Sequence, residues 1–151
     1  MAIFLPFMLI SCTNQSDSSG GSYSMSIQED LTNKTIRLKV DNDLVDVSWE
    51  ENESVEALKD RVKDGLAIRM RKYGDFEQVG SLMSTLPSND TRITTKPGDI
   101  CLYSSNQIVV FYAPNTWEYT KLGHINLDED ELNSLLGHNS VTLVFDLAER
   151  N

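Results

Sequence analysis

The chain has 151 residues, of which 40% are hydrophobic, so it is long enough to form one domain around one core without disulfides or metal. Its formal net charge of −10 argues against nucleic acid as a partner and against electrostatic adhesion to anionic lipid, because both need clustered lysine and arginine. The two cysteines lie in unrelated surroundings, so we expect no disulfide, and without convincing histidine or cysteine partners we expect no metal site. We expect no cofactor either.

The first twelve residues have the character of a bacterial lipoprotein leader. Residues 1–11 form an apolar run that is too short to span a bilayer, and Pro6 disfavours a buried strand there. Residues 9–12, Leu-Ile-Ser-Cys, resemble a lipobox, although no lysine or arginine precedes the apolar run. The resemblance implies a signal peptide over residues 1–12, lipidation of Cys12, and a membrane-anchored location on the periplasmic or surface side of the bacterial envelope.

A polar segment follows the leader. Residues 13–26 are rich in serine, glycine, asparagine and glutamine and hold almost nothing to bury, so they cannot offset the entropy of ordering. We interpret them as a flexible tether that would hold a lipid-anchored domain away from the headgroups. The folded domain is expected over residues 27–151.

The first elements of the domain are predicted from periodicity. Residues 35–40 and 45–49 alternate polar with apolar side chains, which predicts a hairpin with one buried face. Asn52 or Ser54 can cap a helix that runs to about residue 63 and ends at Gly65.

The middle of the chain holds the densest strand signal. Residues 66–71 alternate and predict a strand, whereas residues 72–82 carry two glycines and favour a loop. After a short strand around Ile93, the apolar runs 100–103 and 108–112 flank a polar loop and predict an antiparallel hairpin. Both runs are apolar at most positions, so we expect the core to cover one face of this hairpin and the other face to be partly sheltered.

The last elements are a strand, a helix and a strand. Residues 117–125 alternate with mixed parity, which suggests a bulge near Gly123. Asp128 and Glu131 have the spacing of a capping box at the start of a helix, and residues 141–147 alternate again. About eight strands and two helices without a βαβ rhythm favour a closed or nearly closed antiparallel barrel capped by the helices.

Several motifs between residues 73 and 125 match a known pattern in order and spacing. They are Tyr73-Gly74 with Glu77, Gly80 and Leu82; Leu86-Pro87; Gly98-Asp99-Ile100 with Leu102-Tyr103; Val110-Phe111-Tyr112; and Trp117, Tyr119-Thr120, Leu122-Gly123 and Ile125. Together they resemble a bacterial family of cyclophilin-like domain proteins over about residues 35–147. The resemblance implies a mainly β fold, the cyclophilin-like closed eight-stranded antiparallel β-barrel with two capping helices.

The resemblance implies much less about activity. The family shares its fold with peptidyl-prolyl isomerases but has no established function, and a shared fold is a weak guide to activity. The Phe-His-Arg and Gln-x-Gly-Asp-type segments of those isomerases are missing, and the residues around Arg69 do not reproduce the isomerase arginine motif.

The aromatic side chains are the one set with the character of a binding site. Tyr73, Phe76, Tyr112, Trp117 and Tyr119 are expected to line a groove for a peptide or a small hydrophobic ligand. The alternative is that the same rings only fill the core, where they would stabilise the fold without any ligand. Phe111 and Tyr112 are neighbours on one strand, so at most one of them can line a given pocket.

Catalytic groups are not apparent. His124 and His138 have no recognisable triad partner, Asp128 with Glu131 lacks the glycine and final glutamate of an EF-hand, and Cys101 suits a small buried hydrophobe. The sequence therefore predicts an envelope lipoprotein that binds a peptide or small ligand without strong catalysis. A prolyl isomerase that uses Arg69 or Arg71 and a structural or assembly component of the envelope remain alternatives.

Overall fold

The computed structural model describes residues 30–150, which form eleven strands and two helices. The predicted leader, its lipidation site Cys12 and the tether lie outside the described residues. Neither helix of the described residues is long and apolar enough to cross a membrane.

A four-stranded antiparallel sheet joins the first and last strands of the described chain. Its order is β2-β1-β11-β4, with the bounds β1 (Lys34–Val40), β2 (Asp43–Val45), β4 (Leu66–Arg69) and β11 (Thr142–Glu149). Strand β1 pairs with β11 along its whole length, from Lys34 opposite Glu149 to Val40 opposite Leu143. The first and last strands of the domain are therefore the two central strands of this sheet.

A seven-stranded antiparallel sheet makes up the rest of the β structure. Its order is β3-β10-β8-β9-β6-β5, with β7 paired to β10. The bounds are β3 (Val47–Trp49), β5 (Arg71–Tyr73), β6 (Glu77–Ser81), β7 (Thr91–Thr94), β8 (Asp99–Tyr103), β9 (Gln107–Phe111) and β10 (Thr116–Ile125). The predicted hairpin is confirmed as β8 and β9, which pair from Ile100 opposite Val110 to Tyr103 opposite Gln107.

Most of the loop predicted for residues 72–82 is wrong, because residues 72–73 belong to strand β5 and residues 77–81 form strand β6. Gly80 misled the prediction because a glycine in a strand pattern was taken as a breaker. In the structure Gly80 lies where the side chains of Ile68 and Met70 leave no room for a Cβ atom. The glycine therefore permits the close packing of β6 against β4 instead of a turn.

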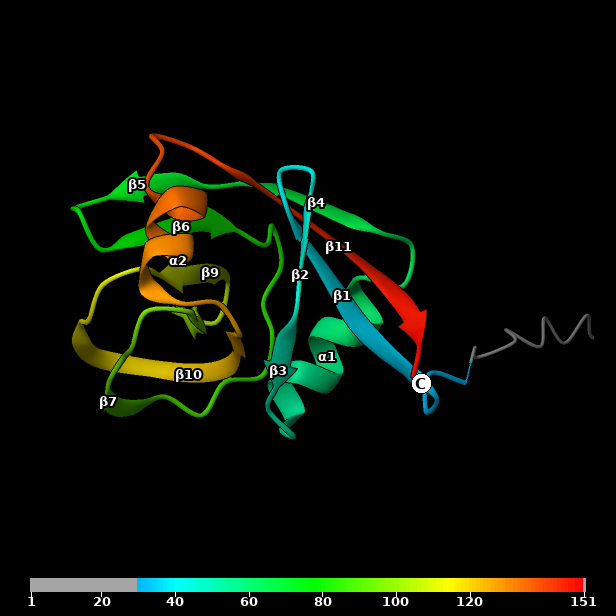
Figure 1. The fold of residues 1–151 in the computed structure, drawn as a ribbon. Coiled ribbons are helices and arrows are strands. Elements are labelled where there is room, and N and C mark those ends of the chain that lie inside the picture. The colour runs from blue at the N-terminus through cyan, green and yellow to red at the C-terminus, as the bar shows by residue number, and fades with distance from the viewer. Residues whose placement is uncertain (1–29, 151) are drawn as a thin grey trace, which may run out of the picture.

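The predicted closed eight-stranded barrel is also wrong, because the described residues form eleven strands in two separate sheets. The chain passes from one sheet to the other at Asp46, between β2 and β3, and at Met70, between β4 and β5 (Figure 1). Met70 N–H donates to Val141 O at 2.8 Å, outside the paired residues of β4 and β11. At such corners a strand changes sheet through a bend or bulge, so that two packed sheets form in place of one closed barrel.

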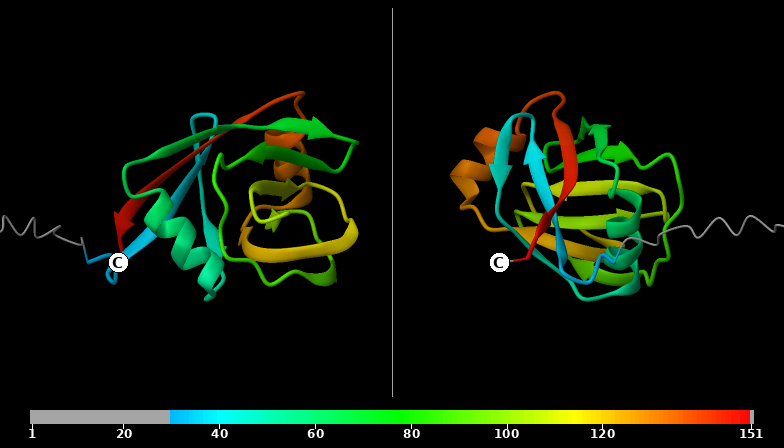
Figure 2. Two further views of the ribbon diagram at one scale, coloured as in Figure 1. Left: turned by 180° about the vertical axis from the view of Figure 1, so that it is seen from behind. Right: turned by 90° about the vertical axis from the view of Figure 1, so that its right-hand side faces the viewer.

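The two helices begin as the sequence predicts. Helix α1 (Glu53–Arg61) has Asn52 as its N-cap, with Asn52 Oδ1 accepting from Val55 N–H at 3.0 Å. Helix α2 (Glu129–Leu136) starts with the predicted capping box between Asp128 and Glu131. In the right-hand view of Figure 2, α1 and α2 lie on opposite sides with the strands between them.

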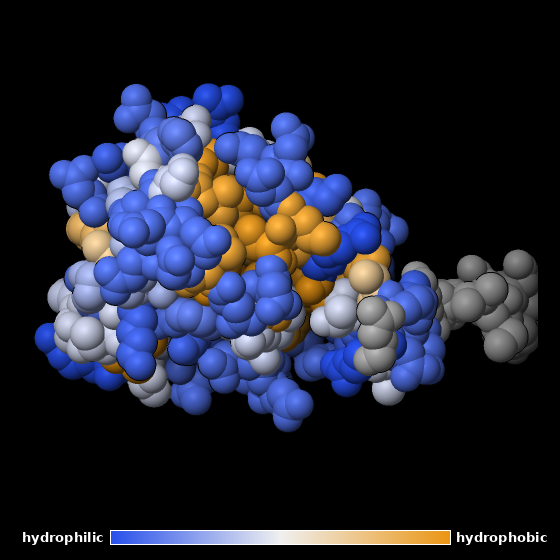
Figure 3. Space-filling model, viewed as in Figure 1, coloured by the Kyte–Doolittle hydropathy of each residue, from blue (hydrophilic) through white to orange (hydrophobic). Residues whose placement is uncertain are grey.

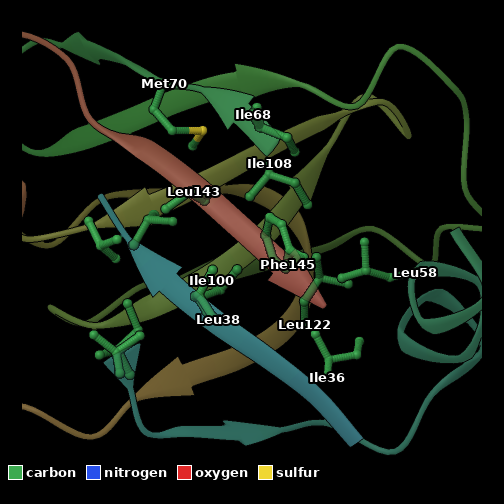
Figure 4. Packing of buried hydrophobic residues seen from close by; sticks show 14 of the residues in the cluster. Ile36, Leu38, Leu58, Ile68, Met70, Ile100, Ile108, Leu122, Leu143 and Phe145 are labelled. Atoms are coloured by element: carbon green, nitrogen blue, oxygen red, sulfur yellow. The ribbon is translucent and has the colours of Figure 1, made fainter. Parts of the chain in front are cut away.

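The main core lies between the two sheets. Figure 4 shows Leu38 and Phe145 from the four-stranded sheet facing Ile100 and Leu122 from the seven-stranded sheet, with Leu58 of α1 at one end. A second, smaller cluster of Cys101, Val109, Phe111 and Tyr119 lies on the other face of the seven-stranded sheet. Strands β8 and β9 therefore bury side chains on both faces, which explains why their sequences are apolar at nearly every position.

Candidate ligand-binding groove

A groove of about 420 Å³ lies over the second cluster, on the outer face of the seven-stranded sheet. Its aromatic walls are Tyr73, Phe76, Tyr103, Trp117 and Tyr119. Its other lining residues are Glu77, Val79, Gln107, Val109 and Asn115. The volume falls in the range of about 300 to 1,000 Å³ that is usual for sites of small ligands.

Strand register brings these side chains to one face. Tyr73 pairs with Glu77 across β5 and β6, and Tyr103 pairs with Gln107 across β8 and β9, so each pair shares a side of the sheet. On β10 the register shifts between Lys121 and Gly123, which confirms the predicted bulge. The bulge lets β10 supply groove side chains before it and core side chains after it.

Tyr119 connects the aromatic rings in and beneath the groove. Its ring makes edge contacts with Phe111 at 5.2 Å and with Tyr103 at 5.9 Å between centroids. Its hydroxyl oxygen accepts a hydrogen bond from Asn115 Nδ2 at 2.9 Å. Burial, reinforced by the charge of Glu77, raises the pKa of Tyr119 to about 12, so its hydroxyl keeps its proton at neutral pH.

The rim of the groove is open to solvent. The side chains of Tyr73 and Trp117 are 67% and 51% exposed, which is unusual for large aromatic residues. Tyr73 contacts Phe76 edge to face, with 6.2 Å between the ring centroids. The groove therefore has a buried floor and aromatic edges that a ligand can cover.

Glu77 is the charged residue of the groove. It is only 7% exposed, and its Oε2 atom is fully enclosed without a hydrogen-bond partner in the described part of the chain. Burial raises the pKa of Glu77 to about 7, because the charged form loses its hydration. At neutral pH the carboxyl group is thus near the midpoint of its titration.

Four of the five predicted ligand-binding residues line this groove: Tyr73, Phe76, Trp117 and Tyr119. Tyr112 does not, because it points to the opposite face and packs in the main core. Its neighbour Phe111 lies on the groove side, in the cluster beneath the groove. The two adjacent residues face opposite sides, as alternation requires, but the sequence did not say which one faces the groove.

A second polar cluster surrounds the buried carboxylate of Asp99. Its Oδ1 lies 2.8 Å from His124 Nδ1 and 3.1 Å from Lys121 Nζ, and its Oδ2 accepts from Lys96 N–H at 2.9 Å. Burial alone would raise the pKa of Asp99, but these hydrogen bonds together lower it. Within residues 30–150, no hydroxyl or thiol group is hydrogen-bonded to His124, so the pair lacks the nucleophile of a triad.

Other candidate residues lie away from the groove. Burial raises the pKa of the Cys101 thiol to about 12, and Cys101 is fully buried as predicted. Arg69 and Arg71 do not line the groove, and Arg69 Nη2 donates instead to Ser140 Oγ at 3.4 Å. Asp128 and Glu131 hold each other in the capping box, and no group of three or more metal-ligating residues occurs in the described part of the chain.

Another hollow, of about 600 Å³, lies between β2 and α2. Figure 3 shows apolar side chains gathered on this face within a polar surround. The apolar lining residues are Leu44, Val45, Leu127 and Leu135. The carboxylates of the lining are all exposed, so solvent already satisfies them.

The comparisons with known proteins give one match. The family model described as "Cyclophilin-like family" matches residues 38–146 of the chain. No curated protein matches the chain. No solved structure matches it either.

Proposed function

This chain belongs to the Cyclophilin-like family, and we propose that it serves as a lipid-anchored binding module of the bacterial cell envelope. The aromatic groove holds a peptide or a small hydrophobic ligand, and Cys12 holds the domain at the membrane. The main observation in support of a binding role is the aromatic groove. Exposed aromatic rings that line a groove outside the main core are more than folding requires.

The anchor is supported by the sequence around Cys12. The lipobox-like residues 9–12 are followed by the polar segment 13–26, which gives the domain reach from the membrane. Each buried methylene contributes about 0.8 kcal/mol, so two acyl chains anchor a protein stably where one chain does not. The groove would then face ligands on the periplasmic or surface side.

Binding is tested with a neutral hydrophobic fluorophore, N-phenyl-1-naphthylamine, titrated into the purified full chain. We expect Trp117→Ala to weaken binding about tenfold, because the substitution removes one aromatic wall of the groove. Leu44→Ala is the matched control, since it removes an exposed apolar side chain from the hollow between β2 and α2. Equal losses in the two variants would mean that the fluorophore does not report on the groove.

Anchoring is tested by fractionating bacteria that produce the protein. We expect the unaltered chain in the membrane fraction and the Cys12→Ala chain in the soluble fraction, because the variant cannot be acylated. Ser11→Ala is the control, since a small residue before the cysteine keeps the lipobox pattern. A Cys12→Ala chain that stays in the membrane fraction would refute the anchor.

A further inference from the structure

The carboxyl group of Glu77 lacks the partner that such a buried group normally has. Among the described residues that line the aromatic groove, Glu77 alone is charged. Its Oε2 atom is enclosed and unpaired, and a buried carboxylate without a hydrogen bond is costly to the fold. Few such groups persist in native proteins, and each one indicates a strained site, a bound water or ion, or a ligand that occupies the site.

The aromatic residues around Glu77 restrict the kinds of ligand group that could pair with it. Aromatic ring faces attract cations, so a positive group in this groove would contact both the rings and the carboxylate. An anion would be repelled by Glu77, and an uncharged apolar group would cover the carboxyl group without satisfying it. A cation with an apolar stem can pair with the carboxylate and also pack against the aromatic rings.

We propose that the aromatic groove binds a lysine side chain of an extended peptide, with the ammonium group beside Glu77 and the methylene stem against the aromatic walls. The inference rests on the proposed function and names the ligand of that same groove. The net charge of −10 would also draw a basic peptide toward the domain.

The geometry favours lysine over arginine. Because Glu77 Oε2 is enclosed, a ligand in the groove reaches the carboxyl group through Oε1. A guanidinium group binds a carboxylate best through two parallel hydrogen bonds, which need both oxygens. A compact ammonium group can donate to one oxygen alone.

The rim favours a peptide over a free amine. The side-chain amide of Gln107 makes no hydrogen bond within the described residues, and Asn115 uses only its Nδ2 atom, on Tyr119. These amide groups flank the groove and can pair with the main chain of an extended peptide. The exposed rings of Tyr73 and Trp117 can then cover part of that chain.

The proposed pairing makes binding depend on pH. With a pKa of about 7, the free Glu77 carboxyl group is mostly ionised at pH 8.5 and mostly neutral at pH 5.5. Cys101 and Tyr119 lie on the same face of the sheet as Glu77, and Tyr112 lies near it on the opposite face. Burial raises the pKa of each of the three, so they stay neutral over this range. Lys72 and Asp75, at the turn beside it, pair with each other at 2.9 Å.

The test is calorimetric titration of the purified full chain with two blocked peptides. One is acetyl-Gly-Ala-Lys-Ala-Gly-amide, and the other has norleucine in place of lysine, which keeps the stem and removes the charge. At pH 8.5 we expect the lysine peptide to bind at least about tenfold more tightly. At pH 5.5 we expect this preference to fall at least about fivefold.

The variants locate the effect. Glu77→Gln should abolish the preference for lysine, whereas Glu118→Gln should keep it, because Glu118 is exposed on β10 and does not line the groove. Both variants change the net charge equally, so an equal loss in both would overturn the pairing with Glu77. n-Butylammonium should bind at least about tenfold more weakly than the lysine peptide, and equal binding would overturn the peptide as the source of the ammonium group.

The remaining outcomes separate this inference from the proposed function. If the norleucine peptide binds as tightly as the lysine peptide, the groove binds peptides but the ammonium site is refuted. If binding of the lysine peptide strengthens at pH 5.5, the neutral carboxyl group is donating to the ligand, and the inference is also refuted. If neither peptide binds while N-phenyl-1-naphthylamine still does, the inference of a lysine-containing peptide ligand is refuted. The proposed function as a groove for hydrophobic ligands is then retained.

Discussion

Glu77, in the candidate groove, carries a buried carboxyl group whose ionisation is unfavourable to the folded state. Its carboxyl group is buried beside aromatic rings, and burial raises its pKa from 4.5 to about 7. The folded state therefore holds a proton more tightly than the unfolded state does. Between pH 4.5 and pH 7 the free energy of unfolding should fall as this group ionises, and above pH 7 the loss should be complete.

Glu77→Gln is consequently expected to stabilise the protein in alkaline solution. We expect the free energy of unfolding to rise by about 2 kcal/mol at pH 8.5 and to change little at pH 4.5. Urea denaturation at the two pH values measures the difference. The exposed Glu118→Gln should change the free energy by less than about 0.5 kcal/mol at both. A Glu77→Gln effect that is the same at both pH values would contradict the assigned burial of charge.

The sequence could predict the aromatic residues of the groove but not its carboxylate. Rings are conspicuous, whereas Glu77 was placed in an expected loop, where a glutamate is ordinarily solvated. Its burial depends on β6 lying between β5 and β9, a register that needs the whole sheet. Tyr103 was within reach of the sequence, because it alternates with the buried Cys101 on the same strand.

Among the turns and strands, the segment at Gly98 joins three parts of the seven-stranded sheet. Gly98 N–H donates to Phe111 O at 2.7 Å, and Gly98 O accepts from Ile125 N–H at 2.8 Å. Its φ angle is +94°, and a Cβ atom there would lie 2.7 Å from Ile125 O. Both the backbone conformation and the neighbouring chain therefore require glycine.

A matched pair of substitutions separates these two requirements. Gly65, after α1, has a similar φ angle of +82°, but a Cβ atom there would have no neighbour within 4 Å. We expect Gly65→Ala to lower the free energy of unfolding by about 1 kcal/mol, through backbone strain alone. Gly98→Ala should cost about 3 kcal/mol or more, because the steric clash adds to the strain. Equal losses in thermal or urea unfolding would contradict the close approach of Ile125.

Elements with strong local signals were predictable, and those that depend on distant neighbours were not. The capping box of Asp128 and Glu131 and the hairpin of β8 and β9 follow from adjacent residues. The division of residues 45–49 between two sheets does not, because β3 pairs with β10, far away in sequence. Likewise, Gly80 of β6 is required by its close contact with Ile68 of β4 and with Met70, which are distant in sequence.

At the scale of the whole molecule, strands at the edge of the seven-stranded sheet should open more readily than strands inside it. Strand β9 lies inside the seven-stranded sheet between β8 and β6, whereas β7 pairs only with β10 and is mostly exposed. We expect the amides of β7 to exchange hydrogen through local opening, at least about 100-fold faster than those of β9. Native-state hydrogen exchange measures both, and equal protection of β7 and β9 would contradict the arrangement.

The family resemblance located the domain correctly and overstated its closure. The motifs fall within residues 38–146, where the family model matches, but the strands form two sheets. Whether the strands close into one barrel depends on whether strand pairing continues across Asp46 and Met70. The sequence around these two residues holds no local pattern that predicts the break in pairing. Alternation predicts which side chains share a face, and it says nothing about where a strand changes sheet.

Strand β10 gives the domain a useful asymmetry. Its second half is fixed by the pairing of residues 123–125 with β3 and by the burial of Leu122 and Ile125 in the main core. Its first half presents Trp117 at an exposed rim. The exposed rim of the proposed binding groove and the contacts of the main core thus lie on different halves of this strand. If the groove binds ligands as proposed, a combinatorial library at the rim residues Tyr73, Tyr103 and Trp117 should yield new binding specificities on an unchanged scaffold.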